Sequence, residues 1–577
     1  MYRGQSILIP MGVGGLQTDL PQSRIAPTQL IEARNVTLVN GYCEKHPGSL
    51  VWNKNSPING DTTLPSPIQT FQEYFPNFYT QRVLALCANG SLYKFNTQYN
   101  RVLMTPEGTS PANFLVEKTA HIAVGGNEVA GGPRKAFIFS GASPVQVVEG
   151  DTDTYRAMKK PALDWSTSYP RFGLIYRSRL WCFGNTNAPD FLYASREGDQ
   201  EDFQTNSTPA SALDWQYFDV AGGEGSGITG LFVFKNRLYI CKGSAGLYQL
   251  NDYDLNPANW SITRVNADFG SANSHAIAQI FDDALVMNTQ GSITSVSAAF
   301  QFGDIQSSDI FMSSKVERYF RQVVSGLGLK ESYGLYYPDK KQVYFTFRTP
   351  SSQYQNGIVV LDLFNKQAQI SYTDKDQPNC LGLIQDNTGI GRPVYGANDG
   401  NLYMMDAEDR WVAHAEDFDF YVEPGYWAEL YAVGEVDDYG FVAQTPHMDF
   451  GFADPTLGLK TKRFDFLEVT FQPTGGWNLD VDVYIDSEYK ETISFPLIRD
   501  RGLSYQPPVN NPPSGFQLDV DYLDGDFPKS IRKPLHGQGR TISFKLRNAD
   551  LLENVKIQSL MVYFRAADER QIKDPRT

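Results

Sequence analysis

Residues 225–296 read GSGITGLFVFKNRLYICKGSAGLYQLNDYDLNPANWSITRVNADFGSANSHAIAQIFDDALVMNTQGSITSV and contain the pattern that decides the fold. Two alternating apolar runs, at 231–233 and 238–240, flank the turn-like pair Lys235-Asn236. Alternation at period two predicts β-strands, and a short polar step between such runs predicts a turn. A glycine corner and a third alternating run follow. We therefore interpret this unit as a β-meander.

Three glycines at the start of the stretch, Gly225, Gly227 and Gly230, match the dinucleotide fingerprint G-x-G-x-x-G. That motif binds pyrophosphate where a helix begins directly after it, because the helix N-terminus supplies N–H donors. A predicted strand follows here instead. We therefore expect these glycines to serve turns, and we expect no cofactor.

The meander recurs between Arg82 and Asp406, at a mean interval of about 52 residues. The second strand of each copy is expected to start at Leu92, Val145, Leu192, Leu247, Ile293, Ile358 and Leu402. This period is typical of β-propeller blades, whereas immunoglobulin-like sandwiches repeat at about twice it and β-solenoid rungs at about half of it. The sequence therefore predicts an all-β chain with a six- or seven-bladed β-propeller.

The pattern divides the chain into five parts. They are an N-terminal arm at residues 1–50, a propeller at 51–410, an acidic junction at 411–460, a β-sandwich-like platform domain at 461–567 and a tail at 568–577. In the platform, alternation predicts strands at 462–472, 477–486, 491–498, 515–523, 540–548 and 555–566.

The N-terminal arm does not follow the repeat. The stretch from Ala26 to Asn35 is expected to form one helical turn or two, residues 36–39 are expected to form a strand, and Asn40-Gly41 predicts a hairpin. An isolated hairpin is marginal in water, so the arm must pack on something else. It is either an edge of the main fold, packing on the platform, or a contact to a neighbouring subunit.

Two further segments interrupt the β pattern. Apolar residues at three- and four-residue steps predict a helical insertion near 309–325, on the rim of the propeller. Acidic residues are frequent between Glu408 and Asp438. We expect either a solvated linker there or an acidic surface that lines a channel or faces a basic partner.

Composition limits the function classes. The formal net charge of −15 argues against a protein that grips phosphates through clustered Lys and Arg. The chain has 5 cysteines, and they are scattered without a C-x-x-C pair, so neither a zinc site nor a disulfide framework is expected. No apolar run is long enough for a membrane span, and we expect a soluble chain made and kept in the cytoplasm.

Acidic pairs and loops offer weak signals of chemistry. A glycosidase needs two carboxylates across a cleft, but Asp480 and Asp482 share one face of a predicted strand, close to Asp486. A second acidic group approaches a calcium loop, but its spacing has one residue too many for an EF-hand. Its members are Asp519, Asp521, Asp524 and Asp526.

No constellation of catalytic residues stands out. The six histidines are isolated from one another in sequence, at His46, His121, His275, His414, His447 and His536. No Ser or Cys lies in a nucleophile-elbow context. We therefore expect no enzyme activity and assign no catalytic, cofactor-binding or metal residues.

Residues 11–49, MGVGGLQTDLPQSRIAPTQLIEARNVTLVNGYCEKHPGS, resemble the start of tail structural proteins of bacteriophages. The likeness lies in a glycine-rich opening, the Asn35-Val36 strand and the turn at 44–48, where His46 replaces the usual Arg before Pro-Gly. Parts of the blade repeats, KRFDFLEVTF at 462–471 and IQSLMVYFRAADER at 557–570 are similar to the same group.

The resemblance is to tail nozzle or hub proteins of short-tailed phages, the tail tubular protein B type. It implies a virion tail protein, assembled in the host cytoplasm, that forms a homohexameric ring below the portal and adaptor. Genomic DNA would pass through this ring without specific binding. Tail fibres and a plug protein are the other partners that the resemblance suggests. The alternative is a receptor- or glycan-binding propeller, as in a tail spike or a lectin.

Overall fold

The computed structural model describes eleven segments of the chain. They are residues 4–52, 63–96, 101–126, 133–300, 326–407, 412–413, 437–438, 440–472, 478–497, 528–548 and 555–566, with gaps at 12, 40, 47, 109, 111–113, 208–210, 244–245, 255, 268, 282, 298–299, 364–368, 374–376 and 387–388. The expected helix at 309–325, the expected strand at 515–523, most of the acidic stretch, the four aspartates between 519 and 526 and the tail at 568–577 lie outside the described residues.

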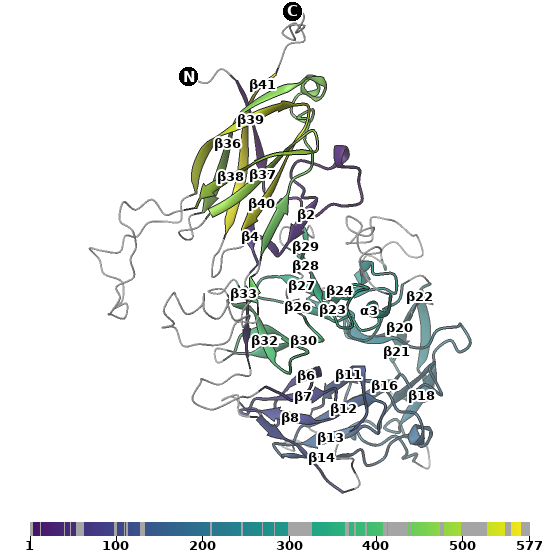
Figure 1. Cartoon of the computed structure of the whole chain (residues 1–577). Coiled ribbons are helices and arrows are strands. Elements are labelled where there is room, and N and C mark those ends of the chain that lie inside the picture. The colour runs from purple at the N-terminus through teal and green to yellow at the C-terminus, as the bar shows by residue number, and fades with distance from the viewer. Residues whose placement is uncertain are drawn as a thin grey trace, which may run out of the picture.

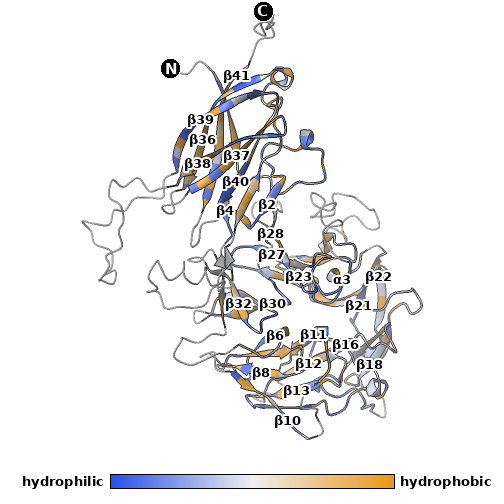
Figure 2. Ribbon diagram, in the orientation of Figure 1, coloured by the Kyte–Doolittle hydropathy of each residue, from blue (hydrophilic) through white to orange (hydrophobic). Residues whose placement is uncertain are grey.

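The expected all-β class is confirmed. Figure 1 shows two bodies, a group of small sheets below and a taller pair of sheets above that holds both ends of the chain. Apolar residues recur along the strands of both bodies (Figure 2). The described helices are short, for example α3 at Gly326–Leu329 and the 3-10 turns at Gln22–Arg24 and Leu163–Ser166.

The lower body consists of small antiparallel meanders, which we number sheets 1 to 7 in chain order. Sheet 1 contains β6 (Ile68–Tyr74), β7 (Arg82–Cys87), β8 (Leu92–Phe95) and β9 (Arg101–Leu103), and sheet 2 contains β11 (Val116–Val124), β12 (Lys135–Gly141), β13 (Gln146–Glu149) and β14 (Thr154–Ala157), with β10 (Thr105–Pro106) paired to β14. Sheet 3 contains β15 (Phe172–Tyr176), β16 (Arg179–Phe183), β17 (Phe191–Ala194) and β18 (Gln216–Asp219). Sheet 4 contains β19 (Gly230–Phe234), β20 (Arg237–Lys242), β21 (Gly246–Asn251) and β22 (Ser261–Asn266).

Sheets 5 to 7 complete this body. Sheet 5 contains β23 (Ile277–Ile280), β24 (Asp283–Met287) and β25 (Ile293–Ser295). Sheet 6 contains β26 (Gly334–Tyr337), β27 (Gln342–Phe347), β28 (Gly357–Asp362) and β29 (Gln369–Thr373). Sheet 7 contains β30 (Cys380–Gln385), β31 (Gly391–Gly396), β32 (Leu402–Ala407) and the N-terminal β5 (Gly48–Val51). The seven strands expected as the second strand of each repeat copy are confirmed. Each is the third strand of its sheet and begins within one residue of its predicted start.

The first strands of consecutive sheets are neighbours. β6 contacts β11, and the series continues through β15, β19, β23, β26 and β30, which again contacts β6. No sheet closes on itself. Instead, buried apolar clusters fill the spaces between consecutive sheets, such as sheets 1 and 2, 2 and 3, and 3 and 4. The seven sheets therefore follow one another in a circle.

One glycine turn recurs between the second and third strands of three sheets. Gly90, Gly291 and Gly400 have φ values of +84°, +86° and +85°, which L side chains rarely adopt. At Gly90 and Gly400 an added Cβ would also lie 2.1 and 2.0 Å from the carbonyl oxygens of Phe114 and Leu64. Glycine is needed there because the chain that leads to another sheet crosses close over the turn.

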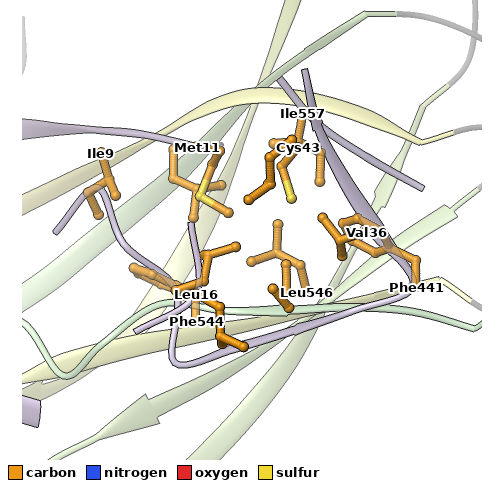
Figure 3. Packing of buried hydrophobic residues seen from close by; sticks show 14 of the residues in the cluster. Ile9, Met11, Leu16, Val36, Cys43, Phe441, Phe544, Leu546 and Ile557 are labelled. Carbon is orange, nitrogen blue, oxygen red and sulfur yellow. The ribbon is translucent and has the colours of Figure 1, made fainter. Parts of the chain in front are cut away.

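The upper body contains two larger sheets. One has the order β3 (Val36–Val39), β4 (Tyr42–Lys45), β41 (Lys556–Ala566), β36 (Lys462–Gln472) and β39 (Lys529–Gly539), and β1 (Gln5–Pro10) also pairs with β41. The other continues sheet 6 beyond β29 through β2 (Glu32–Arg34), β35 (Phe441–Gln444), β40 (Ile542–Asn548), β37 (Asn478–Ile485) and β38 (Glu488–Pro496). One buried apolar cluster, part of which is drawn in Figure 3, contains residues of these two larger sheets together with residues of sheets 5 and 6.

The N-terminal residues connect the two bodies. β1 and the β3–β4 hairpin pair with β41, β2 lies between β29 and β35, and β5 is the outermost strand of sheet 7. The expected hairpin at Asn40-Gly41 is confirmed, because Val39 faces Tyr42 across a two-residue turn. This arm therefore packs within its own chain, on the upper body and on sheet 7.

Two sequence expectations for strands differ from the structure. The helical turns expected from Ala26 to Asn35 are wrong. The segment instead begins with a single turn, in which the Gln29 N–H donates to the Ala26 carbonyl, and continues as the strand β2. Pairing with β29 and β35 satisfies this segment's backbone in an extended form. β39 was not expected, because KSIRKPLHGQG lacks apolar alternation, yet β36 supplies its hydrogen-bonding partner.

Gly400→Ala and Gly389→Ala provide a matched test of the crossing between sheets 7 and 1. Both glycines have positive φ, but nothing lies within 4 Å of an added Cβ at Gly389. We expect Gly389→Ala to cost about 1–2 kcal/mol of unfolding free energy. Gly400→Ala should cost about 1–3 kcal/mol more, because its methyl group overlaps the Leu64 carbonyl. Urea unfolding followed by tryptophan fluorescence measures both, and equal losses would contradict the crossing.

Candidate functional site

Two histidines that are 154 positions apart in the sequence meet where the first strands of several sheets converge. His121 lies on β11 of sheet 2, and His275 lies just before β23 of sheet 5. Their ring centroids are 5.2 Å apart. Asn273 fixes the backbone at His275, because its Oδ1 accepts the N–H groups of His275 and Ala276.

Aromatic rings and backbone groups from neighbouring sheets enclose this pair. Phe172 of sheet 3 stacks on His121 at 4.1 Å, and Tyr333, just before sheet 6, stacks on His275 at 4.3 Å. The Tyr333 hydroxyl donates to the carbonyl of Gln69 in sheet 1. We call His121, His275, Phe172 and Tyr333 the hub cluster. It joins five of the seven sheets.

Burial keeps both imidazoles neutral. It lowers the pKa of His275 to about 4, although hydrogen bonds to the carbonyls of Thr119 and Ala120 act in the opposite direction. Burial, followed by the proximity of His275, also holds the pKa of His121 well below its usual value. At neutral pH the hub cluster is therefore uncharged.

Ion pairs lie close to the hub cluster in the sequence. Glu117 on β11 pairs with Arg171 at 3.0 Å, and Lys118 lies 3.5 Å from Glu331, which also pairs with Arg348 at 3.1 Å. These charges compensate one another. Two imidazoles without a third ligand do not make a metal centre, and within the described segments no cluster of three His, Cys, Asp or Glu side chains has metal-binding geometry. The hub cluster is thus suited to packing between sheets.

A second buried polar group joins sheets 2 and 3. Glu201, which is 2% exposed, lies 2.8 Å from Lys135 and 2.6 Å from Arg156. Burial alone would raise the pKa of Glu201, but hydrogen bonds from Arg156 and Lys135 outweigh it and hold this pKa at about 2. Such a pair is costly to break, because removal of one partner leaves a buried charge.

The carboxylates considered from sequence have structural partners. Asp480 and Asp482 share a face of β37, as expected; Asp480 accepts a hydrogen bond from Ser494, and Asp482 pairs with Arg547 at 2.7 Å. Asp486 accepts the backbone N–H groups of Arg540 and Thr541. The three side chains therefore hold strands together. The strand expected after the three glycines is also found, because β19 begins at Gly230; Gly230 itself therefore lies in the strand and not in the expected turn.

The remaining residues singled out from sequence do not gather into a site. His46 is buried beside β4, His447 is half-buried and His536 is exposed on β39, whereas His414 lies outside the described residues. All five cysteines are buried and free. Burial raises the pKa of every thiol, and that of Cys87 and Cys241 reaches about 12, so the thiolate form is disfavoured.

The proximity of His121 and His275 was not apparent from the sequence, in which the histidines are isolated from one another. In the folded chain these two rings meet. The available signal was that both belong to the first-strand part of a repeat, since His121 lies within β11 and His275 lies just before β23. Without knowledge of how the sheets circle, that signal did not specify a contact.

An aromatic ladder lies on the outer edge of sheet 3. Tyr217 on β18 stacks on Phe191 at 5.4 Å and on Trp215 at 6.0 Å. Tyr217 is 54% exposed. The indole Nε1 of Trp215 is buried and donates to no group in the described residues. This face offers a flat aromatic surface to solvent.

The neutral hub cluster predicts a loss of stability in acid. A histidine in the unfolded chain has a pKa near 6.5, whereas the pKa of His275 in the folded chain is about 4. Between these two pH values the unfolded chain binds a proton that the folded chain does not bind. The free energy of unfolding therefore falls as the pH is lowered from about 6.5 to about 4. We expect His275→Gln to flatten the dependence of the thermal midpoint on pH between about 4 and 6.5, because glutamine does not titrate. His536→Gln is the control and should leave the slope as it is. Equal slopes in wild type and His275→Gln would contradict this account.

Comparisons with known proteins leave the family open. No protein-family model matches the chain, and no curated protein matches it. The similar solved structures include the computationally designed Ika8 protein, with 12% identity, 59% of this chain and 97% of that chain covered, and a TM-score of 0.34. They also include the exo-β-1,3-galactanase of Phanerochaete chrysosporium, with 10% identity, coverage of 90% and 100%, and a TM-score of 0.26. At such TM-scores these likenesses carry no argument.

Proposed function

We propose that sheets 1 to 7 are the blades of a seven-bladed β-propeller and that the two larger sheets form a β-sandwich-like platform. The circular order of the first strands supports the propeller. The N-terminal β5, which completes the last sheet, also supports it, because propellers need a closure between first and last blades. The apolar cluster shared by the two larger sheets supports the platform.

We propose that the chain is a structural subunit of the tail of a short-tailed phage, in a homohexameric nozzle or hub that encloses the DNA exit channel. The observation that carries this proposal is the place of the segment that resembles such proteins. Residues 11–49 include β2, the β3–β4 hairpin and the start of β5, which hold the propeller and the platform together. A tail hub must transmit force as one unit, and this segment provides the connection.

The hub cluster bears on where DNA would pass. His121, His275 and Tyr333 fill the region where the first strands converge, and they bridge sheets on different sides of the circle. DNA therefore has no path along the axis of a single propeller in this proposal. The channel would lie between subunits, and the adaptor, fibres or a plug protein would contact the assembled ring.

Net charge is compatible with such a channel. Each chain carries a formal charge of −15, so a hexamer carries about ninety negative charges. Like charge repels the phosphates of DNA and disfavours non-specific binding to the channel wall.

Mass photometry and negative-stain imaging of the purified chain test the nozzle proposal. We expect particles of about six times the chain mass, with a central channel between subunits and a filled axis in each propeller. The assembled mass should hold as salt is varied from about 50 to 500 mM if apolar contacts dominate the subunit interfaces. A species that stays monomeric or trimeric at micromolar concentration would refute the hexamer.

One observation favours the second candidate, a glycan-binding propeller. Sugars bind proteins through flat aromatic rings combined with hydrogen-bonding groups, and the ladder of Phe191, Tyr217 and Trp215 offers the rings. The exposed Asp219 follows Tyr217 on the same face of β18. In this alternative, the outer edge of sheet 3 would contact a surface glycan of the host.

Tyr217→Ala and Tyr489→Ala distinguish a glycan site from general stickiness. The two tyrosines are 54% and 56% exposed, but Tyr489 lies on β38 of the platform, away from the ladder. If the ladder binds a glycan, Tyr217→Ala should abolish retention on a glycan array, with an affinity loss of about tenfold or more, and Tyr489→Ala should retain it. Absence of any retained glycan for the wild-type chain would exclude this function.

A further inference from the structure

The circle of sheets has two ends with different chemistry. An antiparallel meander reverses direction at every turn, so its first and third turns lie at one end and its second turn lies at the other. The segments that lead from one sheet to the next run close to the second turns. An added Cβ would overlap atoms across these approaches, at Gly90 with Phe114, at Gly227 with Pro189 and at Gly270 with Gly243. We call this the crossover end, and we call the end with the first and third turns the turn end.

Aromatic side chains protrude from the turn end, and we call the following four the turn-end rings. Phe78 and Tyr79, in the first turn of sheet 1, are 76% and 98% exposed. Tyr253, in the third turn of sheet 4, is 72% exposed, and Phe281, in the first turn of sheet 5, is 84% exposed. Sheet 1 lies across the circle from sheets 4 and 5, because three steps between neighbouring first strands separate it from each of them (Figure 1). The turn-end rings therefore stand on opposite sides of one end.

Cations lie over two of these rings. The Arg134 guanidinium lies 5.0 Å from the centre of the Phe78 ring, and the Arg237 guanidinium lies 5.3 Å from the centre of the Tyr253 ring. Lys235 belongs to the two-residue turn that precedes Arg237. We call Arg134, Lys235 and Arg237 the turn-end cations. A cation above a ring keeps its charge, so the same place offers an apolar surface and a positive charge.

The turn-end cations have no carboxylate partner among the residues that the structure describes. A neighbouring carboxylate of the turn end is engaged elsewhere, since Asp252 pairs with Arg177 at 2.9 Å. The positive charges of the turn-end cations are therefore not neutralised within the described chain, although the chain has a net charge of −15. An anionic partner is thus favoured at this end of the circle.

The crossover end offers an internal comparison. Lys118 there also lies over an aromatic ring, 5.5 Å from the centre of Tyr354. Unlike the turn-end cations, Lys118 has a carboxylate 3.5 Å away, that of Glu331, which also pairs with Arg348 at 3.1 Å. Tyr354 is 37% exposed, well below the turn-end rings. The turn end therefore combines protruding rings with uncompensated charge, and this site of the crossover end does not.

A flat anionic surface with an apolar interior matches the turn end. A plane can cover rings on opposite sides of the circle together, whereas a small ligand needs its contacts in one concave place. Aromatic side chains are enriched at the interface of a bilayer, and Lys and Arg near its surface are attracted to anionic lipids. Single-stranded nucleic acid also combines stacking with charge, but it binds along a basic groove, and the net charge of −15 opposes it.

We propose that the turn end is a docking surface for an anionic phospholipid bilayer. The turn-end rings enter the boundary between the headgroups and the acyl chains, and the turn-end cations lie against the lipid phosphates. Affinity then has an apolar part from the rings and an electrostatic part from the cations. The inference does not depend on the proposed tail function, because it rests on exposure and charge at this end of the circle.

Flotation of the full chain with lipid vesicles tests the proposal. We expect the chain to float with vesicles of phosphatidylcholine that contain about 30% phosphatidylglycerol, to float less with pure phosphatidylcholine, and to be released as salt rises from about 50 to 500 mM. Equal flotation with both kinds of vesicle, or with neither, would overturn the proposal. Retention on immobilised DNA or dextran sulfate without flotation would assign the turn end to an anionic polymer, which also overturns it.

Phe78→Ser combined with Tyr79→Ser tests the rings. Both side chains are exposed, so the thermal midpoint should stay at its wild-type value, whereas binding to the anionic vesicles should weaken about tenfold or more. Leu163→Ser is the matched control, because Leu163 is 83% exposed but lies at the crossover end, between sheets 2 and 3. It should bind as the wild type does. Wild-type binding by the double variant would refute the docking surface.

Lys235→Gln and Arg237→Gln test the charge. Each removes one cation close to the membrane surface, so binding to the anionic vesicles should fall about fivefold for each. Lys330→Gln is the control, because Lys330 is also exposed but follows α3 at the crossover end. It should leave binding unchanged. Equal losses in Lys235→Gln and Lys330→Gln would indicate attraction without a preferred orientation and would refute the turn end as the docking surface.

Discussion

The parallel pairing of β2 with β29 is the interaction on which the arrangement of the whole chain depends. It turns sheet 6 of the circle of sheets into a nine-stranded sheet that continues into the upper body. The backbone groups at the outer edge of β29 would otherwise be an exposed sheet edge, which proteins generally cover or interrupt. Because β2 covers that edge and β35 pairs with its other side, the two bodies share hydrogen bonds as well as an apolar cluster. One continuous sheet therefore joins the two bodies.

The hub cluster and the ion pairs of sheets 2 and 3 show how polar groups are used inside the circle of sheets. Neutral histidines can be stacked between aromatic rings at modest cost, whereas buried carboxylates need a cation on each side. His121 and His275 are neutral histidines of this kind, and Glu201 is a buried carboxylate that lies between the cations Lys135 and Arg156. The hub cluster connects sheets that are distant in the sequence, and the Glu201 ion pairs connect the consecutive sheets 2 and 3. They favour one particular order of the sheets in the circle.

Most individual strands were predictable from the sequence, and their partners were not. The seven second strands were located to within one residue because alternating apolar residues carry the period-two signal locally. β39 escaped notice because KSIRKPLHGQG has no such alternation, and its strand conformation comes from pairing with β36. Residues 32–34 were misjudged for the related reason that neighbours on both sides, and not local propensity, decide their extended form. The meeting of His121 with His275 depends on the circular order of the sheets, which no local pattern encodes.

The sequence by itself determined the all-β class, the repeat and the hairpin at Asn40-Gly41, because each of these is a short-range property of backbone and side chains. Only the tertiary structure decided that the N-terminal strands complete sheet 7 and the upper body. Contacts between residues hundreds of positions apart depend on which edges and apolar faces remain to be covered once the local elements have formed. That is a property of the assembled sheets, and it becomes defined only when they pack.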